Sequence, residues 1–222
     1  MDQYIEKALN VSLEEFEKVT KYPVSDFKIK LFKAFELEAD FMTKVSAMDE
    51  AFDDEPHMEA LREVYFDLLM VNFFTEDVKK LESDYLESPE WEAIEEETID
   101  RGTEMLNVLL YIQECRDESM EPDLEDFLKE FLLVDEDEFQ DEHRIYEDVI
   151  ANQMLMESEV PEIAKVAGRL PEDSEFNELF YPVMNFFYQS NPSSHEMDVY
   201  IRHCMDPEFD VPVYALLIAF NN

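Results

Sequence analysis

Apolar residues recur at intervals of three and four positions along most of the chain, a spacing typical of amphipathic helices. In residues 26–52, for example, Phe27, Leu31 and Phe35 fall on one stripe of a helix. Residues 65–74 (YFDLLMVNFF) are apolar on nearly all sides. We therefore expect the first segment to face the core and the second to lie at its centre.

Helix-start signals divide this pattern into separate elements. Ser12 followed by Glu15 has the spacing of a capping box and predicts a helix over residues 12–22. Pro89, directly after Ser88, suits the first turn of a helix that runs to residue 116. The remaining helices are expected at residues 26–52, 54–74, 75–87, 124–131, 136–157, 161–169, 174–190, 195–205 and 211–220.

These elements predict an all-α fold, an irregular multi-helix bundle of about ten helices. Gly102 and Gly168 are the only glycines, and the turn signals that separate strands do not recur. The uneven spacing of the helices argues against a repeat architecture. Gly102 falls on the apolar stripe of the 88–116 helix, and a missing side chain there predicts that another helix crosses closely.

One polar segment, residues 117–123, interrupts the helical pattern and contains Pro122. It predicts a boundary between an N-terminal helical half, residues 1–118, and a C-terminal helical half, residues 119–222. A single domain over residues 1–222 is the alternative.

Composition and charge narrow the classes of partner. Hydrophobic residues make up 46% of the chain, well above the content of disordered sequences. Asp and Glu number 57 against 17 Lys and Arg, a net charge of −40, which repels phosphate backbones and anionic lipid headgroups. We therefore expect no direct nucleic-acid binding and no membrane binding, and we expect basic proteins, polyamines or divalent cations as candidate partners.

The sequence also bears on the compartment. Cys115 and Cys204 are the only cysteines, which supports neither a disulfide framework nor a multi-cysteine zinc site. The first residues show no basic segment followed by an apolar one, and the longest apolar stretch, residues 211–220, is too short to cross a bilayer. These features predict a cytoplasmic protein.

Sequence patterns for bound cofactors and metals do not emerge. Two isolated glycines cannot form a phosphate-binding loop. Only His57 has a carboxylate three positions before it, so the paired Glu-x-x-His motif of di-metal bundles is missing. The acidic run that starts at Asp135 has Phe139 and Gln140 where an EF-hand loop needs a ligand and a glycine. We expect neither a cofactor nor a metal.

His203 and Cys204 are neighbours in sequence, but neighbours on a helix point about 100° apart. A catalytic cysteine–histidine pair needs spatial contact. We expect Cys204 to be buried beside Ile201 and His203 to point outward, and no catalytic residue is assigned.

The densest negative charge lies in residues 117–142, which contain 13 acids and one base, Lys129. Most such runs are solvated helix faces, yet this one is the expected attachment point for a basic partner. The candidate partner-binding residues within it are Asp135, Glu136, Asp137, Glu138, Asp141 and Glu142.

Together these features favour a non-enzymatic protein-interaction module. Such an adaptor, chaperone-like or regulatory protein would use its acidic surface to bind a basic or amphipathic protein partner. One alternative is an acidic DNA mimic that occupies the nucleic-acid-binding site of another protein. Another is an enzyme with a carboxylate-lined helical pocket. A contiguous exposed apolar patch would favour the chaperone-like hypothesis, and a deep cleft with two carboxylates of raised pKa would favour the enzyme.

Overall fold

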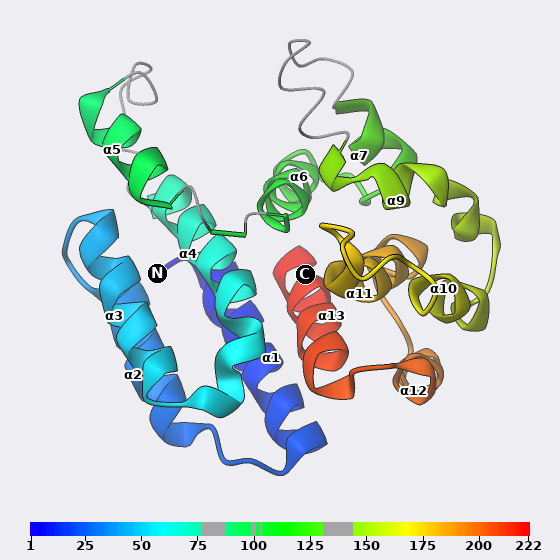
Figure 1. Ribbon diagram of the computed structural model, residues 1–222, viewed down its shortest axis with the longest axis horizontal. Coiled ribbons are helices and arrows are strands. Elements are labelled where there is room, and N and C mark those ends of the chain that lie inside the picture. Colours follow the sequence, from blue (N-terminus) through cyan, green and yellow to red (C-terminus); the bar gives the residue numbers. More distant parts are fainter. Residues whose placement is uncertain (77–87, 99–100, 103, 131–143) are drawn as a thin grey trace.

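The computed structural model describes residues 1–76, 88–98, 101–102, 104–130 and 144–222 (Figure 1). These residues form helices and contain no strand, which confirms the predicted all-α bundle. The helices are α1 (Gln3–Thr20), α2 (Ser25–Glu36), α3 (Phe41–Asp53), the 3₁₀ helix η1 (Pro56–Leu61), α4 (Arg62–Glu76), α5 (Pro89–Thr98), α6 (Leu106–Asp117), α7 (Leu124–Glu130), α9 (Glu147–Ala151), the 3₁₀ helix η5 (Gln153–Glu157), α10 (Val160–Ala167), α11 (Asn177–Tyr188), α12 (Ser194–His203) and α13 (Pro207–Asn221).

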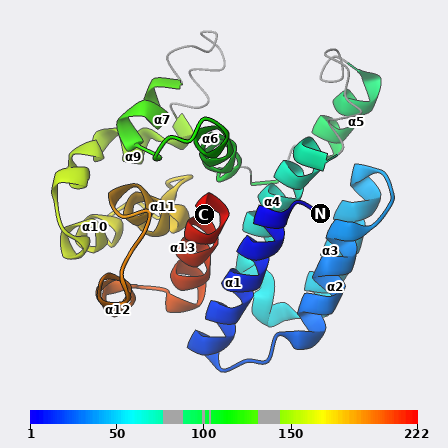
Figure 2. The same cartoon turned by 180° about the vertical axis from the view of Figure 1, so that it is seen from behind.

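Among the helices that the structure describes, the first and the last pack against each other most extensively. α13 lies along α1 and also packs on α11, so it occupies the middle of the molecule in both views (Figures 1 and 2). α2 and α3 pack against each other beside this centre, and α10 and α12 lie on the outer side of α11. The domain boundary expected near residue 118 stays a prediction.

α4 lies in the core, as its apolar sequence predicts. Residues 65–73 are all buried, and Leu68 has no exposed surface. Two polar side chains, Asp67 and Asn72, are therefore buried with the rest of the helix. Asn72 Oδ1 accepts a hydrogen bond from the Asp2 backbone N–H at 3.1 Å, whereas Asp67 lies in the candidate site described below.

The expected start of the first helix at Ser12 is wrong. α1 begins at Gln3, where the carboxylate of Asp2 accepts hydrogen bonds from the backbone N–H groups of Tyr4 and Ile5. Ser12 is buried within the helix, and its hydroxyl is hydrogen bonded to that of Tyr65 at 2.9 Å. A serine can cap a helix or satisfy a partner inside the core, and here the buried tyrosine hydroxyl requires the second role.

The single long helix expected over residues 26–52 is two helices, α2 and α3. Leu37 leaves the helix with an extended backbone, and the Asp40 side chain caps α3 by accepting from the Thr43 N–H at 2.9 Å. The apolar stripe continues across the break because both helices bury Phe27, Phe35 and Val45 in the same core. Periodicity identified the buried face but not the interruption.

The helix expected over residues 88–116 is also divided. Its start is confirmed, because Ser88 Oγ accepts from the Trp91 N–H ahead of α5, but the chain leaves the helix after Thr98 and re-enters it at Leu106. Gly102 lies between the two helices, where an added Cβ would come within 2.7 Å of the Glu104 carboxylate. The predicted helix crossing at this glycine is therefore wrong.

Some of the other expected helices are confirmed and others are not. Thr75 lies inside α4 and donates to the Val71 carbonyl, so it caps no new helix, and residues 77–87 lie outside the described residues. The described part of residues 136–157 holds the short helices α9 and η5 instead of one long helix. The four C-terminal helices are confirmed as α10 to α13, with Pro182 inside α11.

Candidate functional site

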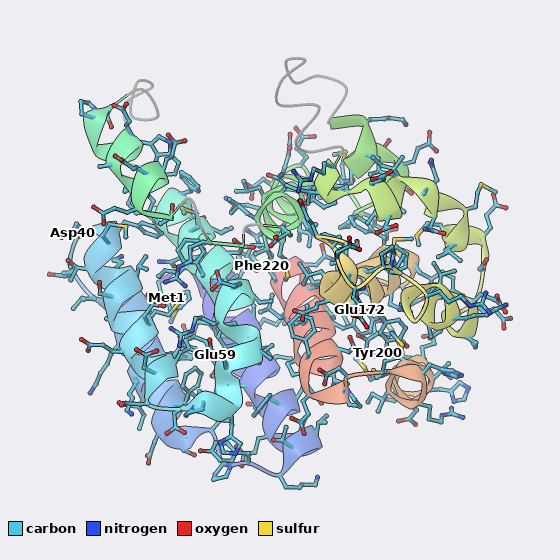
Figure 3. All side chains as sticks on the ribbon, viewed as in Figure 1. Met1, Asp40, Glu59, Glu172, Tyr200 and Phe220 are labelled. Carbon is cyan, nitrogen blue, oxygen red and sulfur yellow. The ribbon has the colours of Figure 1, made fainter. Side chains whose placement is uncertain are left out.

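A cleft of about 610 Å³ opens between η1 and α4 on one side and α11 with the preceding loop on the other. We call it the acidic cleft. Figure 3 labels Glu59 and Glu172, one on each wall. Its lining contains one basic side chain, Arg62, and seven acidic ones: Glu59, Glu63, Asp67, Glu104, Glu172, Glu175 and Glu178.

Local helix geometry places several of these carboxylates. Glu63 and Asp67 are four residues apart on α4, so they lie on the same face of the helix. Glu178 is in the first turn of α11, where a carboxylate interacts favourably with the positive end of the helix. Glu104 lies just before α6, at the end of the break that separates this helix from α5.

Asp67 lies deepest of the acidic residues in the cleft and is 2% exposed. Its Oδ2 accepts a hydrogen bond from the Met105 N–H at 3.1 Å, whereas its buried Oδ1 has no hydrogen-bond partner. Burial raises the pKa of Asp67 well above its ordinary value, and the negative charge of Glu104 raises it further. The burial of Asp67 therefore disfavours the charged form of its carboxyl.

Glu104 and Glu63 line the same cleft as Asp67. Burial raises the pKa of Glu104, and the charges of Glu175, Glu63 and Glu178 add to the effect. Glu63 Oε1 accepts from Arg101 at 3.2 Å, but the buried Oε2 of Glu63 has no hydrogen-bond partner. The cleft thus contains two buried carboxyl oxygens, one on Glu63 and one on Asp67, that lack a donor.

The arginines beside the cleft are already paired with carboxylates. Arg62 forms ion pairs with Asp49, Asp53 and Glu59 at 2.7–3.2 Å. Arg101 pairs with Asp49 and Glu63. Their guanidinium groups also lie over the rings of Phe52 and Phe66, respectively, which fixes both side chains in place. Neither arginine is free to neutralise the opposite wall.

The acidic residues on the opposite wall have fewer ion-pair partners. Glu175 pairs with Arg144, a side chain that is 75% exposed. Glu172 and Glu178 form no ion pair with any residue that the structure describes. The cleft therefore combines an excess of negative charge with a concave shape, and such a shape focuses the field of its charges.

A second pocket of about 260 Å³ adjoins the acidic cleft and reaches Asp210 on α13. We call it the Asp210 pocket. Asp210 is 4% exposed, and its Oδ2 accepts from the backbone N–H groups of Met205 and Asp206, each at 3.2 Å. Burial raises the pKa of Asp210 from its ordinary value of 3.8 to about 7.

This shift predicts how stability depends on pH. Because the folded protein holds the Asp210 proton more tightly than the unfolded chain does, the contribution of this group is complete below pH 3.8 and is lost as the pH rises through about 7. Asp210→Asn keeps an oxygen for the two backbone donors but cannot ionise. We expect the variant to exceed the parent in unfolding free energy by up to about 4 kcal/mol at pH 8, and to match it at pH 4. Urea unfolding at both pH values measures this.

A matched control shows whether the gain in stability comes from the burial of Asp210 or from the change in net charge. Asp198→Asn makes the same chemical change at an exposed position of α12. It should leave the difference between pH 4 and pH 8 unchanged. An equal gain for both variants at pH 8 would show that general charge repulsion, and not the buried carboxyl, is responsible.

The acidic residues singled out from the sequence lie elsewhere. Asp135, Glu136, Asp137, Glu138, Asp141 and Glu142 are outside the described residues, so their role in partner binding stays a prediction. The DNA-mimic hypothesis depends on the same run and also stays a prediction.

The expected placement, with Cys204 buried beside Ile201 and His203 pointing outward, is wrong. Both side chains are half-buried, whereas Ile201 is exposed. His203 Nδ1 lies 2.9 Å from the Val199 carbonyl, and the Cys204 thiol donates to the Tyr200 carbonyl at 3.5 Å. Burial raises the pKa of Cys204, which disfavours the nucleophilic thiolate.

Neither a metal-binding cluster nor a membrane-spanning helix is present in the described part of the chain. No group of three or more His, Cys, Asp or Glu side chains there is arranged to hold a metal ion, the acidic cleft included. None of the described helices combines the length and apolar character needed to cross a membrane.

Sequence reasoning missed the acidic cleft. One signal was present: Asp67 is the one charged residue in the largely apolar run of residues 65–74, and a buried charge requires a reason. No comparable signal marked Glu172, Glu175 and Glu178, because the chain has 57 acids and only the tertiary fold brings these three opposite α4.

Comparison with protein-family models, curated proteins and solved structures gives no match. A functional proposal therefore rests on the geometry and charge of the site.

Proposed function

We propose that the protein is a non-enzymatic interaction module whose acidic cleft binds basic side chains of a protein partner. The observation that carries this proposal is the cleft itself: seven acidic side chains line a concavity of about 610 Å³ whose single basic residue, Arg62, is already paired. The excess negative charge attracts a cationic group, and the shape allows it to be partly desolvated.

The unpartnered oxygens favour arginine as the bound group. Glu63 Oε2 and Asp67 Oδ1 are buried acceptors without donors. A guanidinium carries five N–H donors in a planar fork and can bond to two carboxyl groups at once. Hydrogen bonds of this charge-assisted kind contribute roughly twice as much as neutral ones. A basic side chain would therefore satisfy groups that the fold leaves unsatisfied.

The exposed apolar residues give less support to an amphipathic partner. The large exposed hydrophobic side chains of the described residues lie on several different elements: Ile29, Leu37, Met120, Met154, Ile201 and Met205. Single exposed apolar residues are normal on a protein surface, and a groove for an amphipathic helix needs a contiguous patch. Charge is thus the stronger basis for recognition.

An enzyme is the second candidate, because Asp67 and Glu104 line the same cleft and both have raised pKa values. A carboxyl that is protonated near neutral pH can act as a general acid. Against this, the Ser174 hydroxyl that lines the cleft is hydrogen bonded to Asp148, so it is not free to act as a nucleophile beside these carboxyls.

Calorimetric titration with a short oligoarginine peptide tests the proposal. The double variant Glu175→Gln with Glu178→Gln removes two charges from the cleft. The matched control, Glu14→Gln with Glu17→Gln, removes two exposed charges with the same spacing on α1. We expect the cleft variant to lose affinity about tenfold or more and the control to change it less than twofold.

Raising the salt concentration should weaken binding to the parent protein more than binding to the cleft variant. Equal losses in the two double variants would mean that the peptide binds the general negative field, and the proposal would fail.

A further inference from the structure

The acidic cleft and the Asp210 pocket form one continuous groove. Both are lined by Ala60 of η1, by Asn177 and Glu178 of α11 and by Phe209 of α13. The groove therefore runs between η1 and the first turn of α11 toward the start of α13. Of the described charged residues, only Glu178 lines both parts of the groove.

Each part of the groove contains one buried aspartate. Asp67 and Asp210 are 2% and 4% exposed, respectively. The Met105 N–H bonds to Oδ2 of Asp67, whose buried Oδ1 has no hydrogen-bond partner, whereas two backbone N–H groups bond to Oδ2 of Asp210. A bound cation would give the unpartnered Asp67 oxygen a donor and would place a counter-charge beside the buried Asp210 carboxyl, which backbone N–H groups hold in place.

The surface between the two aspartates suits a peptide chain. Ala60 and Phe209 provide apolar contacts for the alkyl stems of long basic side chains, which bury their stems and keep their charges near polar groups. Glu178 adds a carboxylate midway along the groove.

From this arrangement we infer that the groove binds an extended dibasic peptide segment, with one arginine side chain at Asp67 and a second at Asp210. The inference rests on the proposed function and specifies the ligand: two cationic groups joined by a chain, supplied by a protein. A cation at only one end would leave the buried aspartate at the other end without a counter-charge.

A double-mutant cycle across the interface tests the two-ended mode. The probe is a peptide with two arginines separated by a short glycine–serine spacer, together with two versions in which one or the other arginine is replaced by glutamine. Asp67→Asn removes one acceptor, because its remaining oxygen must accept from the Met105 N–H and its amide N–H₂ would face the bound cation. Asp210→Asn removes the other charge.

We expect each aspartate substitution to weaken binding of the two-arginine peptide about ten- to a hundredfold. An aspartate substitution should weaken binding much less when the peptide already has glutamine in place of the arginine that this aspartate contacts. Asp67→Asn should therefore be sensitive to the replacement of one arginine, and Asp210→Asn to the replacement of the other. Circular dichroism and thermal unfolding of both variants show whether they remain folded.

Other outcomes separate this inference from the proposed function. If the Glu175/Glu178 variant weakens binding but both aspartate variants couple to the same arginine, the cleft binds cations at one point and the two-ended mode is wrong. If the Glu175/Glu178 variant has no effect, both proposals fail. A free linear diamine that binds as tightly as the peptide would show that a small polyamine, and not a protein segment, is the ligand.

Discussion

Leu68→Asp is expected to destabilise the protein by about 4 kcal/mol or more, enough to unfold most of it at 25 °C. Leu68 is in the middle of α4, has no exposed surface, and lies in a run of ten consecutive buried residues, 64–73. An aspartate there would lose the packing of the leucine and would place a second carboxyl beside Asp67 in the core. Urea unfolding followed by circular dichroism measures the change.

Leu37→Asp is the matched control, because the same chemical change occurs at a residue that is 38% exposed between α2 and α3. Its effect should stay within about 0.5 kcal/mol. A Leu68→Asp variant as stable as this control would mean that α4 does not form the core.

Glu178→Lys is expected to have the largest effect on binding of any single substitution in the groove. Glu178 lines both the acidic cleft and the Asp210 pocket, and it forms no ion pair among the described residues. A lysine there reverses the charge at a residue that lines both parts of the groove, and its ammonium can pair with the neighbouring carboxylates. We expect a loss of affinity for the oligoarginine peptide of about a hundredfold, measured by calorimetry.

The substitution should leave the fold intact, because Glu178 is exposed and a cation in the first turn of a helix costs only about 0.5 kcal/mol. Glu17→Lys, at an exposed position of α1, changes the net charge by the same amount. A loss of similar size in both variants would contradict a local role for Glu178.

The sequence predicted the helical class and the central helix because these depend on local patterns. Apolar spacing and the scarcity of glycine are sufficient to predict helices, and a run that is apolar on all sides, such as residues 65–74, must be buried. Helix ends were predicted less well. Ser12 matched a capping pattern, but the buried Tyr65 hydroxyl uses its side chain instead.

The break between α2 and α3 shows a related limit. The apolar positions keep a helical spacing across residues 37–40, since both helices face the same core, so the pattern alone does not reveal the interruption. Asp40 followed by Thr43 was the signal available, because an aspartate commonly caps the start of a helix.

The candidate site was even less accessible from sequence. Acidic residues within 135–142 were predicted to bind the partner because a sequence displays charge density only along the chain. The acidic cleft instead combines carboxylates of η1, α4, the segment before α6, and the first turn of α11 with the loop before it. The outermost two, Glu59 and Glu178, are 119 positions apart in the chain. Only Asp67, a charged residue in an apolar run, indicated it locally.

The most direct test of the central claim is to locate the bound cation by NMR. Amide chemical shifts of the isotope-labelled protein would be followed during titration with the oligoarginine peptide. If the acidic cleft is the binding site, the largest changes should appear at Met105, whose N–H bonds to Asp67, and at residues 172–178. Changes spread evenly over the acidic surface, or centred on residues 117–130 with Met105 unaffected, would contradict the assignment of this cleft.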